Sequence, residues 1–212
     1  MIDYRKKMEK GWFYHVYNRG NNSERLFYTH GNYAFFLKRY EEYLSNHVDT
    51  YAYCLMPNHF HFLIRVKEGA CQTSNVSHIK KEKHLSDGIA PKNHEETVSK
   101  QFKTLFTSYA KALNKQESRH GSLFEKPFRR IEVNSQNYLV NIVKYIHKNP
   151  QKHGVMNDFE NYTWSSYPII KNNYDSYIKK EEVLSWFDTK ENFVACHKTI
   201  LNDENIKDLL ID

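Results

Sequence analysis

Residues 50–66, TYAYCLMPNHFHFLIRV, constrain the fold more than any other stretch of the chain. Two runs rich in aromatic and aliphatic side chains, 50–56 and 59–66, are separated only by Pro57-Asn58. Such runs predict strands, and a Pro-Asn pair between them is typical of a tight turn. We therefore expect a β-hairpin with two adjacent antiparallel strands.

The second strand of this hairpin has two chemically different faces, because successive side chains of a strand point to opposite sides. One face is apolar and suits a core; it consists of Phe60, Phe62, Ile64 and Val66. The other face begins with His59 and His61, whose Cβ atoms should lie roughly 6–7 Å apart. Two imidazoles at that separation can bind one divalent cation. A purely structural or solvent-facing role for both histidines stays open.

Hydrophobic periodicity and turn residues predict the remaining core elements. In chain order we expect a strand at 11–20, a helix at 31–46, the hairpin strands at 50–56 and 59–66, a helix at 98–116, an extended segment at 121–134 and a helix at 136–149. Pro127 favours an edge position or a bulge for the extended segment. Ser135 is expected to cap the last helix and Pro150 to end it.

This order, β-α-β-β-α-β followed by one further helix, matches the ferredoxin-like pattern. We therefore expect an α+β fold with an antiparallel sheet that carries helices on one face. Residues 67–97 are polar and patternless, which predicts a long, partly mobile insertion. Residues 1–170 are expected to form one domain. Residues 171–212 are expected to form a helical C-terminal extension, with helices near 180–187 and 189–203.

The basic charge of the chain is concentrated in one quarter of it. The sequence has 31 Lys and Arg against 25 Asp and Glu, a net charge of +6. Residues 101–153 alone hold ten Lys or Arg and three Glu. A basic, tyrosine-rich chain of this kind suggests a polyanionic partner such as nucleic acid.

Cysteine usage and hydropathy indicate the compartment. The 3 cysteines are far apart and form no CxxC pair, which argues against a disulfide framework and a thiolate zinc site. No stretch approaches the ~18 continuous apolar residues of a membrane helix, and no secretory leader is evident at the start. We expect a cytoplasmic protein with no membrane partner.

The helix at 136–149 offers a third metal ligand and a nucleophile. Tyr145 and Asn149 are four residues apart and share a helical face with Asn141. Two histidines with an amide ligand leave positions open for water or phosphate, as in a catalytic metal site. Two simpler explanations stay open: tyrosine in mid-helix often packs in a core, and asparagine before proline often ends a helix.

Four stretches together resemble a known family. YHVYNRGNN, AYCLMPNHFHFLIRV, YIHKNPQKHG and WSSYP occur in this order over residues 11–168 and resemble the HUH single-tyrosine transposases. The chain is most similar to the REP-associated tyrosine transposases and related transposases of the insertion-sequence type. The family's His-hydrophobic-His motif corresponds to His59-Phe60-His61. The resemblance implies that Tyr145 is the catalytic nucleophile and that Asn149 completes the metal site.

The resemblance also implies a chemistry: metal-dependent cleavage of single-stranded DNA and strand transfer through a covalent 5′-phosphotyrosine link. Magnesium or manganese held by His59, His61 and Asn149 would polarise the scissile phosphate, and Tyr145 would attack it. Hairpin or palindromic DNA is the expected substrate, and both a monomer and a homodimer stay open. One alternative is a non-catalytic or regulatory DNA- or RNA-binding protein on the same fold. Another is a metal-dependent hydrolase.

Basic side chains near this site are the expected DNA contacts. They are Arg19, Arg119, His120, Lys126, Arg129, Arg130, Lys144 and Lys148. Phe124 and Phe128 lie among them and suit single-stranded DNA, or simply a core. Lys144 and Lys148 are also expected to supply positive potential to the phenol. His147 and His153 are candidates for proton transfer, although solvated histidines near a helix end explain them equally well.

Overall fold

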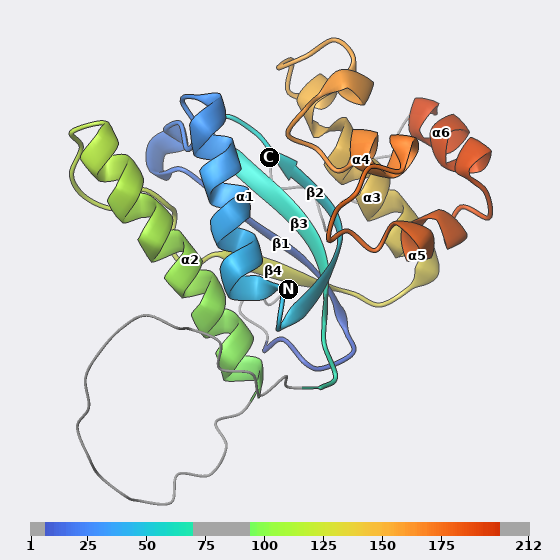
Figure 1. The fold of residues 1–212 in the computed structure, drawn as a ribbon, viewed down its shortest axis with the longest axis horizontal. Helices are drawn as coiled ribbons and strands as arrows, with labels where there is room; N and C mark the ends of the chain where they lie inside the picture. Colours follow the sequence, from blue (N-terminus) through green and yellow to red (C-terminus); the bar gives the residue numbers. More distant parts are fainter. Residues whose placement is uncertain (1–6, 70–93, 200–212) are drawn as a thin grey trace, which may run out of the picture.

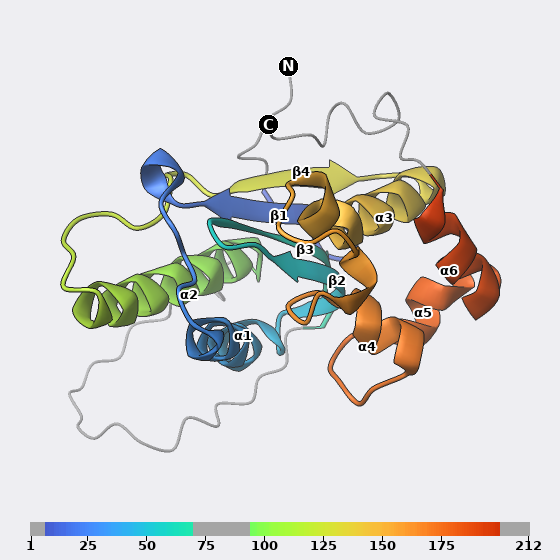
Figure 2. The ribbon, with the colours of Figure 1, turned by 90° about the horizontal axis from the view of Figure 1, so that it is seen from above.

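The computed structural model describes residues 7–69 and 94–199. It contains a four-stranded sheet with helices on both faces (Figure 1). The strands are β1 (Phe13–Arg19), β2 (Val48–Leu55), β3 (His59–Val66) and β4 (Arg129–Val133). They lie in the order β2-β3-β1-β4, and each neighbouring pair is antiparallel. This confirms the expected ferredoxin-like α+β fold, including the hairpin over 50–66 and the edge position of the segment after Pro127. The expectation of helices on one face holds for the two long helices that precede β4 but not for the further helix that follows it, which covers the other face (Figure 2).

Helices α1 (His30–Leu44) and α2 (His94–Gln116) cover one face of the sheet (Figure 2). The apolar face of β3 packs against them: the Tyr40 and Phe62 rings stack with centroids 4.2 Å apart, and the Phe60 ring centroid lies 5.6 Å from that of Phe106. The alternation of β3 therefore builds the core on this side. Helix α2 begins four residues earlier than expected, and most of the predicted insertion at 67–97 lies outside the described residues.

Helix α3 (Gln136–Lys152) lies on the opposite face of the sheet (Figure 2). Ser135 caps it as expected, since its side chain accepts a hydrogen bond from the Tyr138 backbone N–H. The expected end at Pro150 is wrong, because the helix continues to Lys152. One proline in the last turn removes a single backbone donor, and the turn still closes through the His153 N–H, which donates to the Asn149 carbonyl at 3.0 Å.

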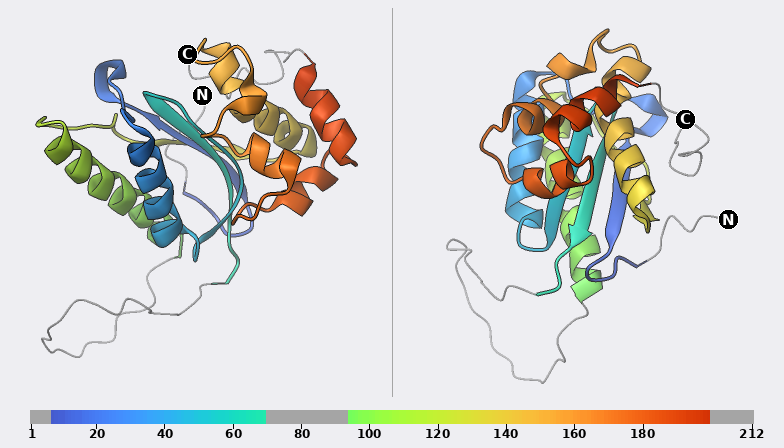
Figure 3. Two further views of the ribbon diagram at one scale, coloured as in Figure 1. Left: turned by 45° about the horizontal axis from the view of Figure 1, so that its top comes forward. Right: turned by 90° about the vertical axis from the view of Figure 1, so that its right-hand side faces the viewer.

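The C-terminal extension gathers beside α3 (Figure 3). It contains α5 (Lys180–Ser185) and α6 (Lys190–Lys198), and α4 (Tyr167–Asn172) crosses its expected beginning at residue 171. Short 3₁₀ turns lie elsewhere, at Asn21–Ser23 and Phe159–Asn161. Helices α5 and α6 correspond to the two expected helices, whereas α4 has no counterpart in the sequence analysis. None of the helices in the described ranges is long and apolar enough to cross a membrane.

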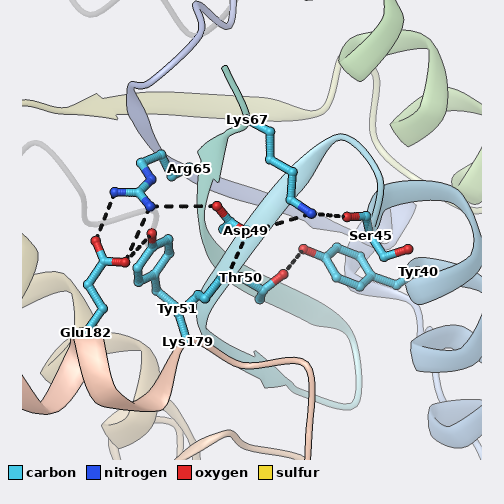
Figure 4. A network of polar contacts seen from close by, with 9 residues as sticks. All are labelled: Tyr40, Ser45, Asp49, Thr50, Tyr51, Arg65, Lys67, Lys179 and Glu182. Carbon is cyan, nitrogen blue, oxygen red and sulfur yellow. Dashed lines mark hydrogen bonds and ion pairs between the residues drawn. The ribbon is translucent and has the colours of Figure 1, made fainter. Parts of the chain in front are cut away.

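Ion pairs attach this extension to the hairpin (Figure 4). Arg65 of β3 binds the Glu182 carboxylate of α5 at 2.9 Å and lies 3.7 Å from Asp49. The Tyr51 hydroxyl donates to the same Glu182 carboxylate at 2.9 Å. Burial and the Glu182 charge raise the pKa of Tyr51, so the phenol stays a neutral donor. These contacts fix α5 at the end of β3 that lies farthest from His59.

Candidate active site

Helix α3 brings two polar side chains onto the histidine face of β3. The Tyr145 ring centroid lies 5.4 Å from that of His61, and Asn149 Oδ1 lies 3.3 Å from His59 Nε2. Tyr145 and Asn149 reach the strand together because they are one helical turn apart. All four residues singled out in the sequence therefore converge, although they come from two elements separated by about ninety positions in the chain.

His59, His61 and Tyr145 line one cavity of about 530 Å³, whereas Asn149 is fully buried and contacts it through His59. Arg19, Arg25 and Arg129 line it together with His59, His61, Tyr145 and His153. Among its lining residues, all of which the structure describes, Glu125 is the only acid. Its carboxylate accepts a hydrogen bond from Arg19 Nε at 2.5 Å and lies 3.7 Å from Arg129. The cavity therefore carries a surplus of positive charge that suits a phosphate group.

His59 and Asn149 turn two acceptor atoms toward each other. The Asn149 amide nitrogen donates to the Tyr145 carbonyl at 3.0 Å, which directs Oδ1 at His59 Nε2. The other nitrogen of His59 lies 2.7 Å from Asn58 Oδ1, a contact that places a proton on Nδ1. In the neutral imidazole Nε2 is then a lone pair that faces a carbonyl oxygen. In this tautomer the two atoms are both acceptors, and a cation could bind between them; in the other tautomer Nε2 donates to Asn149 Oδ1.

The Nε2 atom of His61 is a second candidate metal ligand. It is 2% exposed, and its Nε2 has no hydrogen-bond partner among the described residues. Burial, together with the neighbouring His59, lowers the pKa of His61 well below its usual value. The ring is therefore neutral, as an imidazole must be to bind a metal. A buried nitrogen without a partner is costly unless a ligand binds it.

His15 was not singled out in the sequence, and it holds His61 in place. Its Nε2 lies 2.9 Å from His61 Nδ1, and burial lowers the pKa of His15 to about 3. Both rings are neutral, so one nitrogen of this pair must donate. If His61 donates from Nδ1, its Nε2 lone pair is available to a metal, which is how a neighbouring acceptor orients a metal-binding histidine. The sequence signal was the alternation of His15 and Tyr17 on one face of β1.

The donor set decides what the site could hold. Among the residues that the structure describes, no three His, Cys, Asp or Glu side chains form a metal-binding group. A cation here would therefore depend on the amide of Asn149 beside the two histidines. The amide oxygen, with solvent or phosphate oxygens, suits magnesium or manganese, whereas the two imidazoles suit a transition metal, so the mixed set fits manganese better than magnesium.

Two tyrosines border the cavity. Tyr145 is 1% exposed, and Lys152 Nζ lies 5.2 Å from its ring centroid. Tyr17, on β1, is 3% exposed and pairs in register with His61. Both phenols are therefore close to the histidines, and Lys152, another residue that the sequence analysis missed, brings a cation to the first of them.

Comparison with known proteins identifies a solved structure with a similar fold. No family model and no curated protein matches the chain. Its structure is similar to a solved structure described as the REP-associated tyrosine transposase bound to a REP hairpin. The TM-score is 0.57, the match covers 84% of this chain and 90% of that chain, and 14% of the residues are identical. The two proteins share a fold.

The expected DNA contacts divide between several places. Arg19 and Arg129 line the cavity, and Arg25 joins them. Lys126 and Arg130 line a different cavity, beside α2. His120 is exposed and lines neither. Arg119 forms an ion pair with Glu24 and donates to Asn114 Oδ1 at 2.7 Å, so its guanidinium orders a loop.

Three expected side chains of α3 face the C-terminal extension and not the cavity. Lys144 Nζ donates to the Thr199 hydroxyl at 2.9 Å, and Lys148 Nζ donates to the Thr199 carbonyl at 2.8 Å. His147 is fully buried, with one ring nitrogen 2.8 Å from His197 and the other 2.8 Å from the Ser166 hydroxyl. These positions do not favour DNA contact for the lysines or proton transfer for His147.

His153 lies where proton transfer is feasible. It lines the cavity, and its ring centroid lies 5.1 Å from that of His59. It is exposed to solvent, so it can exchange protons with water. Of the two histidines considered for proton transfer, the structure brings only this one to the cavity.

Proposed function

We propose that this chain is a DNA transposase that cuts a single strand through Tyr145 and transfers it. The observation that carries the proposal is the convergence of Tyr145, His59 and His61 in one arginine-lined cavity, with Asn149 Oδ1 3.3 Å from His59 Nε2. The similar fold of a transposase whose structure is described as bound to a REP hairpin supports the DNA substrate. The sequence resemblance to the HUH single-tyrosine transposases supports the reaction.

Three atoms are proposed to hold a magnesium or manganese ion: His59 Nε2, His61 Nε2 and Asn149 Oδ1. The unpartnered nitrogen of His61 and the two facing acceptors of His59 and Asn149 support this assignment. When bound, the ion supplies positive charge that neutralises the scissile phosphate. His15 holds the His61 ring, and a hydrogen bond donated by His61 Nδ1 to His15 would leave the His61 Nε2 lone pair free for the ion.

Tyr145 is proposed to act as the nucleophile. Its hydroxyl oxygen attacks the phosphorus, the new O–P bond forms as the bond from phosphorus to the 3′ oxygen breaks, and the leaving oxygen takes up a proton. The phenol proton passes to His153 or to water. The phosphotyrosine link keeps the energy of the phosphodiester, so the 3′-OH of a second strand can attack it and release Tyr145.

The arginines are proposed to hold the strand. Arg25 and Arg129 line the cavity and can bind the phosphates on either side of the cut. Arg19 is engaged by Glu125, so its main role is to keep that carboxylate neutralised. Burial of Tyr145 and His61 keeps bulk water away from the reacting phosphate, which favours strand transfer over hydrolysis.

The test uses labelled hairpin and single-stranded oligonucleotides with manganese and the full chain. A protein–DNA adduct that survives denaturing electrophoresis, together with a released 3′-OH fragment, is the expected result. Binding without cleavage would instead favour a non-catalytic or regulatory DNA- or RNA-binding protein. Cleavage without an adduct would favour hydrolysis by water.

Replacing His61 by glutamine is expected to weaken manganese binding by at least about tenfold, because it removes one of three ligands. Isothermal titration of the DNA-free protein measures this without relying on activity. The matched control is His120→Gln, which changes an exposed histidine outside both cavities. Equal manganese affinity in wild type and His61→Gln would contradict the metal assignment.

A further inference from the structure

A second cavity of about 910 Å³ lies between residues 103–114 of α2 and residues 121–130. We call it the α2 groove. Its floor is formed by Phe106, Phe124 and Phe128, which are between 5% and 8% exposed. Ala110 of α2 forms part of its wall and is half-buried. The groove is therefore apolar inside and open enough to admit a flat ring.

Lysines form the rim of the α2 groove. Lys103, Lys111 and Lys126 line it and are exposed, and none of them forms an ion pair with another residue in the described ranges. The Arg130 guanidinium also lines the groove, 5.1 Å from the centre of the Phe128 ring. An apolar floor inside a cationic rim is complementary to a flat apolar ring attached to a phosphate.

The α2 groove adjoins the candidate active site, since Asn18 and Glu125 line both cavities. The Asn18 amide donates to the Glu125 carbonyl at 3.2 Å, and its Oδ1 accepts from the Arg19 backbone N–H at 2.9 Å. The Glu125 carboxylate is bound by Arg19. The wall between the two cavities is therefore held in place and presents no free negative charge to a passing strand.

We propose that the α2 groove binds an unpaired base of the same DNA strand that is cut at Tyr145, with the adjoining phosphates bound by the lysines of its rim. This inference rests on the proposed function and adds a base-binding subsite to it. A base in a duplex is stacked and paired, so it cannot enter the groove. The subsite therefore selects single-stranded DNA next to the cleavage position.

The proposal is tested by a substitution that fills part of the α2 groove. Ala110→Leu replaces the methyl group in the wall by a larger branched side chain. Ala112→Leu makes the same change at an exposed position of α2 outside the groove. Fluorescence anisotropy without metal measures the affinity for a single-stranded oligonucleotide, for its duplex, and for a series of oligonucleotides that each lack one base. Thermal unfolding checks that both variants fold.

In the wild type, removing the base that enters the groove is expected to weaken binding about tenfold. Ala110→Leu should weaken binding of the intact single strand by a similar factor and should no longer respond to that missing base. Ala112→Leu should behave as wild type, and duplex affinity should not change. Wild-type affinity of Ala110→Leu for single strands, or an equal loss for duplex, would overturn the proposal.

A second pair of variants keeps the groove testable if Ala110→Leu does not fold. Lys103→Gln with Lys111→Gln should lower single-strand affinity and its salt dependence, whereas Lys115→Gln, on the same helix outside the groove, should have little effect. Adduct formation is measured separately. Groove-dependent binding without an adduct would support the subsite and contradict the transposase proposal, and an adduct with groove-independent binding would do the reverse.

Discussion

Replacing Tyr145 by phenylalanine is expected to abolish the covalent protein–DNA adduct and to lower strand cleavage by at least about 10³-fold. Only the hydroxyl oxygen is lost. The ring keeps its contacts with His15 and His61, whose centroids lie 6.1 Å and 5.4 Å away. DNA binding and manganese binding should therefore stay close to wild type. Denaturing electrophoresis measures the loss of the adduct, and a binding titration of the same protein measures whether DNA and manganese still bind.

Tyr17→Phe is the matched control for this variant. Tyr17 borders the same cavity, is also buried, and its ring centroid lies 6.0 Å from that of His61. It carries the same chemical group on a strand instead of on α3, so its substitution should leave the adduct intact. If Tyr17→Phe lost the adduct and Tyr145→Phe kept it, the nucleophile would have to be reassigned.

Mild acid is expected to unfold the protein, because α3 and α6 are joined by two buried neutral histidines. Burial lowers the pKa of His197 to about 3, and burial together with the neighbouring His197 lowers the pKa of His147 well below its usual value. Above pH 6.5 both histidines are neutral in the folded and the unfolded chain, so they add no pH dependence. Below pH 6.5 only the unfolded chain takes up protons, so stability falls as the pH falls toward the folded pKa values.

Each of these histidines should remove up to about 1.4 kcal/mol of unfolding free energy per pH unit in this range. His197 alone would remove roughly 3 kcal/mol by pH 4.5, and His147 acts in the same direction; this is a large part of the stability of many domains. Urea unfolding at a series of pH values measures this slope.

The variant His197→Gln separates this effect from general damage to the packing. It should be less stable at pH 7, and its stability should fall less steeply below pH 6.5, because one titrating group has been removed. A slope equal to that of the wild type would contradict the assignment. His61 also has a lowered pKa, so the series is best recorded with a metal chelator present.

The central site could be predicted because it depends on short-range geometry. The alternation of β3 separates His59 and His61 from the core face, and the spacing of Tyr145 and Asn149 sets them one turn apart. Both rules act within one element, and the only long-range requirement was that α3 should cover the histidine face. The ferredoxin-like order made that arrangement plausible.

The remaining site residues depend on which elements pack together, and periodicity does not reveal this. Lys144 and Lys148 face α6, a neighbour that the sequence analysis could not position. His15 becomes important only once β1 is paired with β3 in the observed register. Pro150 was expected to end α3, yet the packing of that helix outweighs the loss of one hydrogen bond near its end.

The contacts between α3 and α6 separate two properties of the protein: the orientation of Tyr145 and the binding of DNA. His147, Lys144 and Lys148 connect the tyrosine-bearing helix to a segment that lines neither cavity. In the proposed reaction, the orientation of Tyr145 would therefore be set partly by residues that line neither cavity. A change in this segment would then alter the rate of the proposed cleavage and leave the affinity for DNA unchanged.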